Sequence, residues 1–224
     1  MLTEQDRGIF IKPGKANLAK YLGAWLSDSV KPNLAGNTFN LYAFLCKKHI
    51  FPALGNIVLV DLKPQHLQKF YAEKKASGLS SRTVQLLHVV LHKALKNAVK
   101  TGLLSRNVSE AVDAPKNTRH EIKVMSETDI HLFLEMARDT EYYSLFYTLL
   151  FTGMRRNEAL ALRWSNVDLL LCQLSVTRSM EHLTDPSQHY RITFKEPKTE
   201  KSRRLIALSP STVAVLREHK RSSE

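Results

Sequence analysis

Hydrophobic residues in the first half of the chain recur every three to four positions, which is the spacing of one face of an α-helix. The segments with this spacing are residues 17–30, 37–50, 64–76 and 81–101. Prolines and glycines stand between them, at places where helices begin or end. A short fifth helix is expected over residues 108–112. The pattern therefore predicts an all-helical domain over residues 17–112.

The longest predicted helix, residues 81–101, has two faces of different character. Its apolar face is formed by Val84, Leu87, Leu91, Ala94, Leu95 and Ala98. Lys93, Lys96 and Lys100 lie together on another face. This arrangement predicts that the apolar residues pack in the core of the domain, while the lysines meet solvent or a charged partner.

The second half of the chain begins with a break in the helical pattern. Residues 113–124 are polar and contain Pro115, which is typical of a linker. Further helices are expected over residues 126–138 and 143–151, after Gly153, and from Ser209 onward. Before the last of them the hydrophobic period changes to two, which predicts strands at 172–180, 190–195 and 202–208. We expect residues 125–224 to form an α+β domain, so the whole chain is mainly α with a small antiparallel β-sheet.

The charge balance points to a polyanionic partner. Lysine and arginine number 33 against 21 aspartates and glutamates, which gives a formal net charge of +12. Such an excess favours binding to nucleic acid. The alternative is a basic surface that serves only to keep the protein in solution.

Composition argues against several other classes of protein. The two cysteines, Cys46 and Cys172, have no metal-binding spacing and suit a reduced, cytoplasmic compartment. No apolar run is long enough to span a membrane, and the first residues lack the apolar core of a signal peptide. His88 and His92 have helical spacing without an acidic third ligand, so a solvated helix face is favoured over a zinc site. We therefore expect no metal, no cofactor and no membrane partner.

The most informative motif follows the predicted helix at 143–151. Thr152 and Gly153 end this helix, and a new one is expected to begin at once with Arg155 and Glu158 on the same face. A helix N-terminus with an arginine beside it favours phosphate binding, and Glu158 can hold the guanidinium in place. The alternative is a surface ion pair that contributes less than about 1 kcal/mol.

Residues 149–168 resemble the first-arginine motif of the tyrosine recombinases, the phage-integrase family. That motif reads Thr-Gly-x-Arg-x-x-Glu followed by Leu-x-Trp-x-x-x-Asp. Four other segments resemble landmarks of the same family in the correct order, at residues 18–26, 49–57, 78–84 and 196–208. The resemblance implies a helical, SAM-like core-binding domain at 17–112, followed by part of the family's catalytic domain at 125–224.

Members of this family cut DNA through attack of a tyrosine on a backbone phosphate, without metal or ATP. The resemblance implies that Arg155 stabilises the charge of the reacting phosphate, because a guanidinium donates to two oxygens at once. Lys198 matches the family's catalytic lysine through the pattern Lys-Thr-x-x-Ser-x-Arg and would protonate the leaving oxygen. Glu158 would support Arg155. The alternative for Lys198 is an ordinary basic hairpin residue, since Lys195 and Lys201 lie close to it in the sequence.

The resemblance also implies a set of contacts to DNA backbone phosphates. The candidates are Lys47, Lys48, Arg82, Lys93, Lys96, Lys100, Arg203 and Arg204. Asn37, Thr38, Asn40 and Gln85 have side chains suited to reading bases, and the sequence does not decide among them.

Parts of the family's pattern are missing from this sequence. The later His-x-x-Arg box does not occur, and none of the seven tyrosines follows the last predicted helix, where the family's nucleophile stands. Residues 1–16 resemble the end of an arm-type DNA-binding domain. We therefore expect a DNA-binding fragment of a recombinase that integrates a mobile element. The fragment is expected to be truncated at both ends and inactive alone.

Two alternatives stay open at this point. One is a non-catalytic DNA-binding regulator or scaffold that reuses the integrase fold. The other is a helical protein-interaction module whose charge is incidental. The expected partners are double-stranded DNA and other recombinase protomers on that DNA.

Overall fold

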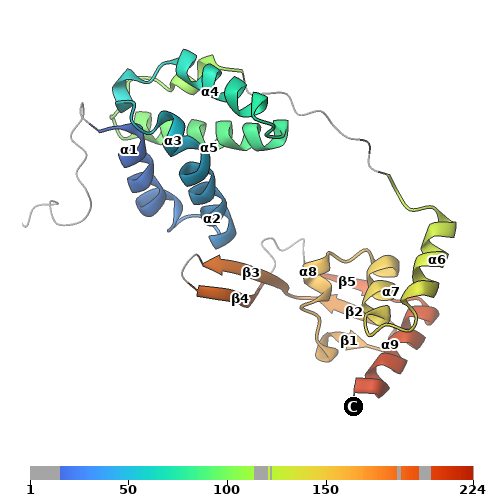
Figure 1. Ribbon diagram of the computed structural model, residues 1–224. Coiled ribbons are helices and arrows are strands. Elements are labelled where there is room, and N and C mark those ends of the chain that lie inside the picture. Colours follow the sequence, from blue (N-terminus) through green and yellow to red (C-terminus); the bar gives the residue numbers. More distant parts are fainter. Residues whose placement is uncertain (1–15, 114–120, 122, 186–187, 197–202, 224) are drawn as a thin grey trace, which may run out of the picture. The chain divides into compact units, whose positions relative to one another are not determined.

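The computed structural model describes residues 16–113, 121, 123–185, 188–196 and 203–223 (Figure 1). Backbone contacts divide the chain into two units, residues 1–120 and 121–224, and each is described by itself. The predicted remnant at 1–16 lies, apart from Ala16, outside the described residues, as does most of the predicted linker at 113–124. Both boundaries therefore stay predictions.

The first unit is helical, as predicted. Its α-helices are α1 (Leu18–Trp25), α2 (Gly36–Leu45), α3 (Phe51–Leu54), α4 (Pro64–Ala76) and α5 (Ser81–Lys100). Two π-helical turns, Leu26–Val30 and Cys46–Ile50, extend α1 and α2, and 3₁₀ turns lie at Leu59–Asp61 and Val108–Ala111. One boundary differs from the prediction. The helix expected to end at residue 50 is followed directly by α3, and Pro52 lies in the first turn of α3, where the missing N–H of proline costs nothing.

Helix α5 forms the centre of the first unit's core. All six residues of its predicted apolar face are buried, together with Leu18 and Leu22 of α1. The Tyr21 hydroxyl of α1 donates a hydrogen bond to the Ala94 carbonyl at 2.6 Å, which ties the two helices together. The prediction that this face packs inward is confirmed.

The two histidines of α5 do not lie on a solvated face, contrary to the prediction. His88 and His92 are half-buried, and their rings stack with centroids 5.9 Å apart. The hydroxyl of Tyr71 is 3.2 Å from His88 Nδ1, and that of Ser109 is 3.1 Å from His92 Nδ1. The histidines therefore connect α5 to α4 and to the 3₁₀ turn that follows α5.

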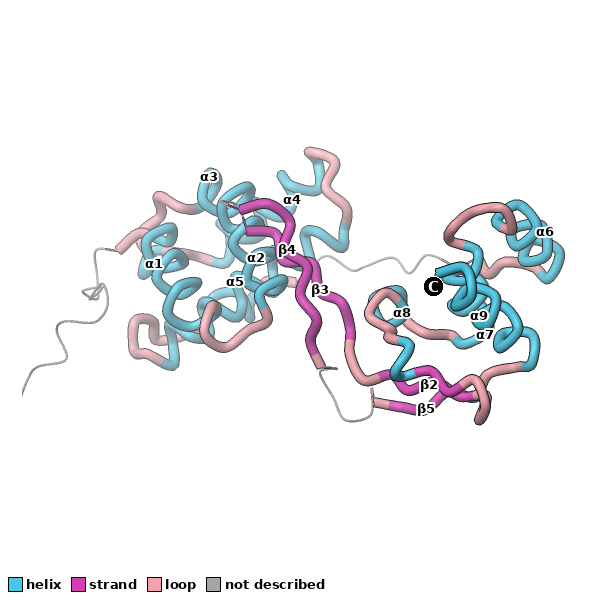
Figure 2. Tube along the Cα trace, turned by 90° about the horizontal axis from the view of Figure 1, so that it is seen from below, coloured by secondary structure: helices cyan, strands magenta, loops and turns pink. Residues whose placement is uncertain are grey.

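The second unit combines helices with short antiparallel strands. Its helices are α6 (Glu127–Ala137), α7 (Tyr143–Thr152), α8 (Arg156–Ala159) and α9 (Pro210–Ser223), with a 3₁₀ turn at Trp164–Asn166. Its strands are β1 (Val167–Asp168), β2 (Gln173–Val176), β3 (Ser179–Asp185), β4 (Gln188–Lys195) and β5 (Arg204–Ala207). One sheet has the order β1-β2-β5, and β3 pairs with β4 in a separate sheet. Figure 2 shows β2 beside β5 and β3 beside β4.

The single strand predicted at 172–180 is in fact two strands that belong to different sheets. The chain leaves β2 after Val176 and enters β3 at Ser179. Between them the Arg178 guanidinium donates to the Ala161 carbonyl at 2.7 Å and lies over the Phe194 ring, 4.6 Å from its centroid. These contacts stabilise the bend between β2 and β3. The alternation of apolar and polar residues along the sequence does not predict them. Strand β1, which has two residues, was not predicted.

The core of the second unit joins the sheet to α9. Leu174 and Val176 of β2 pack with Val213 and Leu216 of α9, and the same cluster contains Met154 and Leu208. Figure 1 shows α9 next to α7 and the three-stranded sheet. The protein is thus mainly helical with small antiparallel sheets, which confirms the predicted fold class.

Two further observations concern the described part of the chain. No helix in it is both long and apolar enough to cross a membrane. In the same residues, histidine, cysteine, aspartate and glutamate side chains do not gather in groups of three that could hold a metal ion.

We expect a polypeptide of residues 17–112 to fold by itself, because the core residues that the structure describes in the first unit all come from this segment. Circular dichroism should show its helices, and heating should unfold them in one cooperative transition. A gradual melt would contradict this expectation, since it would mean that residues outside the segment complete the core.

Candidate functional site

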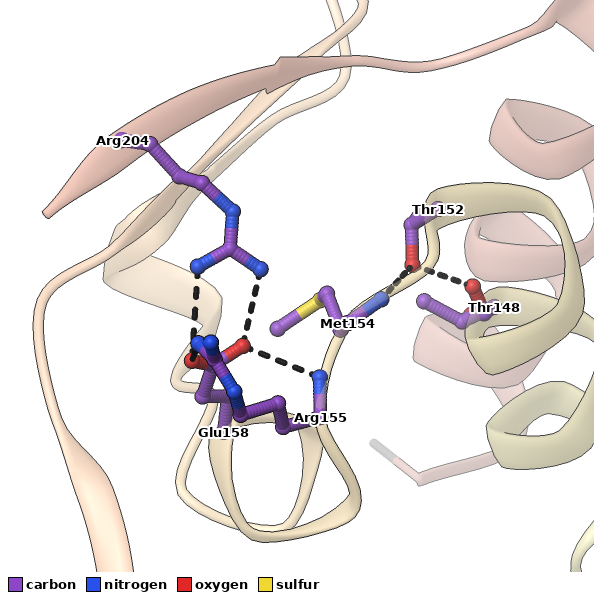
Figure 3. A network of polar contacts seen from close by, with 6 residues as sticks. All are labelled: Thr148, Thr152, Met154, Arg155, Glu158 and Arg204. Carbon is purple, nitrogen blue, oxygen red and sulfur yellow. Dashed lines mark hydrogen bonds and ion pairs between the residues drawn. The ribbon is translucent and has the colours of Figure 1, made fainter. Parts of the chain in front are cut away.

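The site begins at the turn that ends α7. Gly153 closes this helix with φ +62° and ψ +21°, a left-handed conformation that glycine adopts without strain. The Thr152 hydroxyl donates to the Thr148 carbonyl and accepts a hydrogen bond from the Met154 N–H at 3.4 Å (Figure 3). Met154 is buried in the second unit's core. The Thr-Gly pair therefore sets the direction in which the chain enters α8.

Glu158 of α8 lies at the centre of the site, between two arginines (Figure 3). Its Oε2 accepts from the Arg155 backbone N–H at 3.0 Å and from Arg204 Nη2 at 2.8 Å. Its Oε1 accepts from Arg155 Nη1 at 2.9 Å and from Arg204 Nη1 at 3.3 Å. Each carboxylate oxygen therefore binds one group of each arginine, although Arg204 is far away in the sequence.

This environment keeps Glu158 ionised. Burial alone would raise the pKa of its carboxyl group, since only 4% of the side chain is exposed. The hydrogen bonds from Arg204 and Arg155 outweigh burial and lower the pKa from 4.5 to about 2. Glu158 is therefore a permanent anion at neutral pH, suited to holding arginines and unsuited to carrying protons.

One edge of the Arg155 guanidinium is hydrogen-bonded, and the rest of the side chain is exposed to solvent. Its side chain is 73% exposed, and Glu158 takes one N–H of its Nη1. Within the part of the chain that the structure describes, its other guanidinium N–H groups form no hydrogen bond. A guanidinium with these N–H groups available can donate hydrogen bonds to two oxygens of one phosphate.

The helix after Arg155 is a weaker phosphate site than the sequence suggested. Helix α8 has four residues, which is too short for a substantial dipole, and the Arg155 N–H already binds Glu158. An anion at this place would therefore be held by the Arg155 side chain rather than by the helix N-terminus.

The other predicted residues of this unit lie in different situations. Lys198 lies outside the described residues. Arg203 forms an exposed ion pair with Glu196, which contributes little to stability. Arg204 was expected at a phosphate, but its guanidinium is bound to Glu158. The signal for this contact was the arginine that ends the Lys-Thr-x-x-Ser-x-Arg pattern, which sequence reasoning did not connect with Glu158.

The basic candidates of the first unit are all exposed. Lys93 donates to the Tyr42 hydroxyl at 2.9 Å and lies over that ring, while Lys48 lies over the Phe44 ring. Arg82 donates to the Gln85 side chain at 3.2 Å. Lys93, Lys96 and Lys100 follow one another on α5 at helical spacing, as predicted. Lys47 is exposed beside Lys48 in the π-helical turn after α2.

An acid-stability prediction follows from the Glu158 network. The pKa of Glu158 is about 2 in the folded protein, against an ordinary value of 4.5. Its full contribution to the free energy of unfolding of the second unit is therefore present above pH 4.5. This contribution, at most about 3 kcal/mol, is lost as the pH falls from 4.5 to 2. Urea unfolding followed by Trp164 fluorescence, in a Trp25→Phe background, measures it. The Glu158→Gln variant should lose less stability over this pH range, and an equal loss in both proteins would contradict the prediction.

The sequence matches known proteins along almost its whole length. A family profile described as "Phage integrase, N-terminal SAM-like domain" matches residues 17–75. An integrase of Streptomyces ambofaciens is 28% identical over 229 residues, which cover 98% of this chain and 56% of the relative. A protein of Caldanaerobacter subterraneus named "Tyrosine recombinase XerC-like" is 25% identical, with 91% of this chain and 55% of the relative covered. The chain thus spans about half the length of these relatives.

The fold also matches a solved structure. The Tn1549 transposon integrase, in a complex with transposon right end DNA, superposes with a TM-score of 0.79. The match covers 93% of this chain and 66% of that one at 18% identity, so it concerns the fold alone. Together, the matched domain profile and the integrase and recombinase relatives show that the chain is similar to proteins of the tyrosine recombinase family.

Proposed function

We propose that this chain binds double-stranded DNA in a site-specific strand exchange of the tyrosine recombinase type, and that Arg155 holds the reacting phosphate. The observation that carries the proposal is the state of Arg155, which is fixed at one edge by buried Glu158 and exposed along the rest of its fork. The net charge of +12 supports a polyanionic partner. The Tn1549 integrase, which shares the fold, has a structure with DNA.

Each residue has a distinct task in this proposal. Arg155 donates to the non-bridging oxygens of the phosphate, where negative charge gathers in the transition state. Lys198 protonates the leaving oxygen. Glu158 holds Arg155, and the exposed lysines of the first unit contact backbone phosphates and position the duplex. The proposed reaction uses no metal or other cofactor, and other protomers are proposed to assemble on the same DNA.

Cutting needs more than these groups. A tyrosine must be held in line with the phosphate, and the family's second arginine adds to transition-state stabilisation. Neither the His-x-x-Arg box nor a tyrosine after α9 occurs in the 224 residues. We therefore propose that these residues alone bind DNA without cutting it.

Binding should depend steeply on salt. Anisotropy of a labelled 20-bp duplex of random sequence should give a linear fall of log K with log salt concentration, with a slope of about −0.9 per phosphate contacted. Changing Lys93, Lys96 and Lys100 together to glutamine should make the slope shallower by up to about 2.7. The cause is the loss of contacts from one face of α5.

The matched control removes the same charge elsewhere. Lys20, Lys69 and Lys75 are exposed on α1 and α4, and their triple change to glutamine should alter the slope less. Equal slopes in the two triple variants would mean that overall charge, not the α5 face, determines binding. No binding at low salt would contradict the proposed function and favour the protein-interaction alternative.

A further inference from the structure

The Glu158 carboxylate is shared between two arginines that differ in exposure. The side chain of Arg155 is 73% exposed, whereas that of Arg204 is 31% exposed. Arg204 directs both of its Nη groups at the carboxylate, one to each oxygen. Arg155 uses one side-chain group and its backbone N–H. The two residues therefore play unequal parts around the same anion.

We propose that Arg204 is a positioning residue, which fixes the Glu158 carboxylate so that Glu158 in turn orients Arg155 toward a phosphate. This inference rests on the proposed function, since it gives Arg155 the phosphate-binding task. It replaces the direct phosphate contact that the sequence suggested for Arg204.

The position of Arg204 explains why it acts through Glu158. Arg204 is the first residue of β5, and its backbone pairs with Val176 of β2, so its main chain is held in the sheet. Its guanidinium fork matches the carboxylate at both oxygens, which is the geometry that arginine prefers. Turning toward a phosphate would break both bonds and leave a buried anion with half of its partners.

Glu158 also needs this second partner to hold Arg155. Helix α8 has only four residues and cannot fix its own side chains through a long helical scaffold. A carboxylate anchored from β5 has few orientations left, so the Arg155 group that binds it is also restricted. This restriction lowers the entropy that Arg155 loses when it meets a phosphate.

The experiment uses the whole ¹⁵N-labelled chain and inorganic phosphate as the probe. The side-chain Nε–Hε signals of the two arginines are assigned with the variants Arg155→Lys and Arg204→Lys. Phosphate should shift the Arg155 signal saturably, while the Arg204 signal stays nearly unchanged. A shift of Arg204 as large as that of Arg155 would overturn the proposal, and this result needs no variant that could fail to fold.

Variants then test whether Arg204 acts through Glu158. Arg204→Gln should raise the apparent Kd for phosphate at Arg155 about tenfold. Arg204→Lys keeps the charge without the fork, so it should recover less than half of this loss on a logarithmic scale. Glu158→Gln should cause a similar loss, and the double variant Glu158→Gln/Arg204→Gln should add little to it, because the two residues act in series.

The outcomes separate this inference from the proposed function. If phosphate does not shift the Arg155 signal in the unaltered chain, Arg155 does not bind phosphate as proposed, and the positioning role of Arg204 is contradicted as well. If phosphate binds at Arg155 but Arg204→Gln changes the Kd less than twofold, only the positioning role is wrong. Full recovery in Arg204→Lys, or additive effects in the double variant, would also overturn that role.

Discussion

A polypeptide of these 224 residues is expected to form no covalent adduct with DNA, even on a duplex that it binds well. A covalent link requires a tyrosine hydroxyl held in line with the phosphate. Tyr21, Tyr42 and Tyr71 are buried in the helical unit. Burial raises the pKa of Tyr21 and Tyr71, which makes them still poorer nucleophiles. Their low exposure argues against attack of these tyrosines on a phosphate.

Three of the other tyrosines lie near α7. The rings of Tyr143 and Tyr147 pack at a tilt of 53° with centroids 5.7 Å apart, and Tyr142 is exposed just before the helix. The side chain of Tyr190 lies outside the described residues, and Tyr190 precedes the Lys198 segment by only a few positions in the sequence. It is therefore the tyrosine to test first.

The substrate for this test is a duplex selected for binding from a random pool, then nicked so that any attack traps the protein on the DNA. The Streptomyces ambofaciens integrase, on an equivalent duplex selected in the same way, serves as the comparison. Denaturing gels should show no adduct with the 224 residues, either unaltered or as Tyr190→Phe. An adduct that disappears in Tyr190→Phe would overturn the prediction and identify Tyr190 as a nucleophile.

Replacing Leu91 with alanine is expected to lower the free energy of unfolding of the first unit by about 2–5 kcal/mol. Leu91 is fully buried on the apolar face of α5, so the change removes packed methyl groups and leaves a cavity. Because α5 also carries Lys93, Lys96 and Lys100, the destabilised protein should bind DNA less well near its unfolding midpoint. Urea unfolding followed by Trp25 fluorescence, in a Trp164→Phe background, measures the change.

The matched control is Leu41→Ala on α2, where the leucine is 40% exposed. This change should cost less than about 1 kcal/mol, because little packing is lost. Similar costs at Leu41 and Leu91 would mean that α5 does not form the centre of the core.

Most helices could be predicted because their signals are local. The apolar face of α5 and the proline at the start of α4 lie within the helix that they specify. The spacing of Arg155 and Glu158 is equally local, since three residues within one helical turn bring them together in almost any fold. Gly153 likewise acts on its own turn.

The interpretations that failed concerned contacts between distant segments. His88 and His92 were placed on a solvated face, although their partners Tyr71 and Ser109 come from a neighbouring helix and turn. The residues of 172–180 alternate as one strand would, yet Arg178 contacts Ala161 and Phe194 at a bend between two sheets. A period of two describes each strand and cannot show where the chain changes sheets.

The sequence by itself therefore determined the helical order of the first unit, the mixed second unit, and the motif that places Glu158 beside Arg155. Only the tertiary structure decided what Arg204 does. Its distance from Glu158 in the sequence is 46 residues, and pairing of β5 with β2 brings the two side chains together. Periodicity and motif spacing report on neighbours within one element, whereas the partner of a buried charge is chosen by the packing of separate elements.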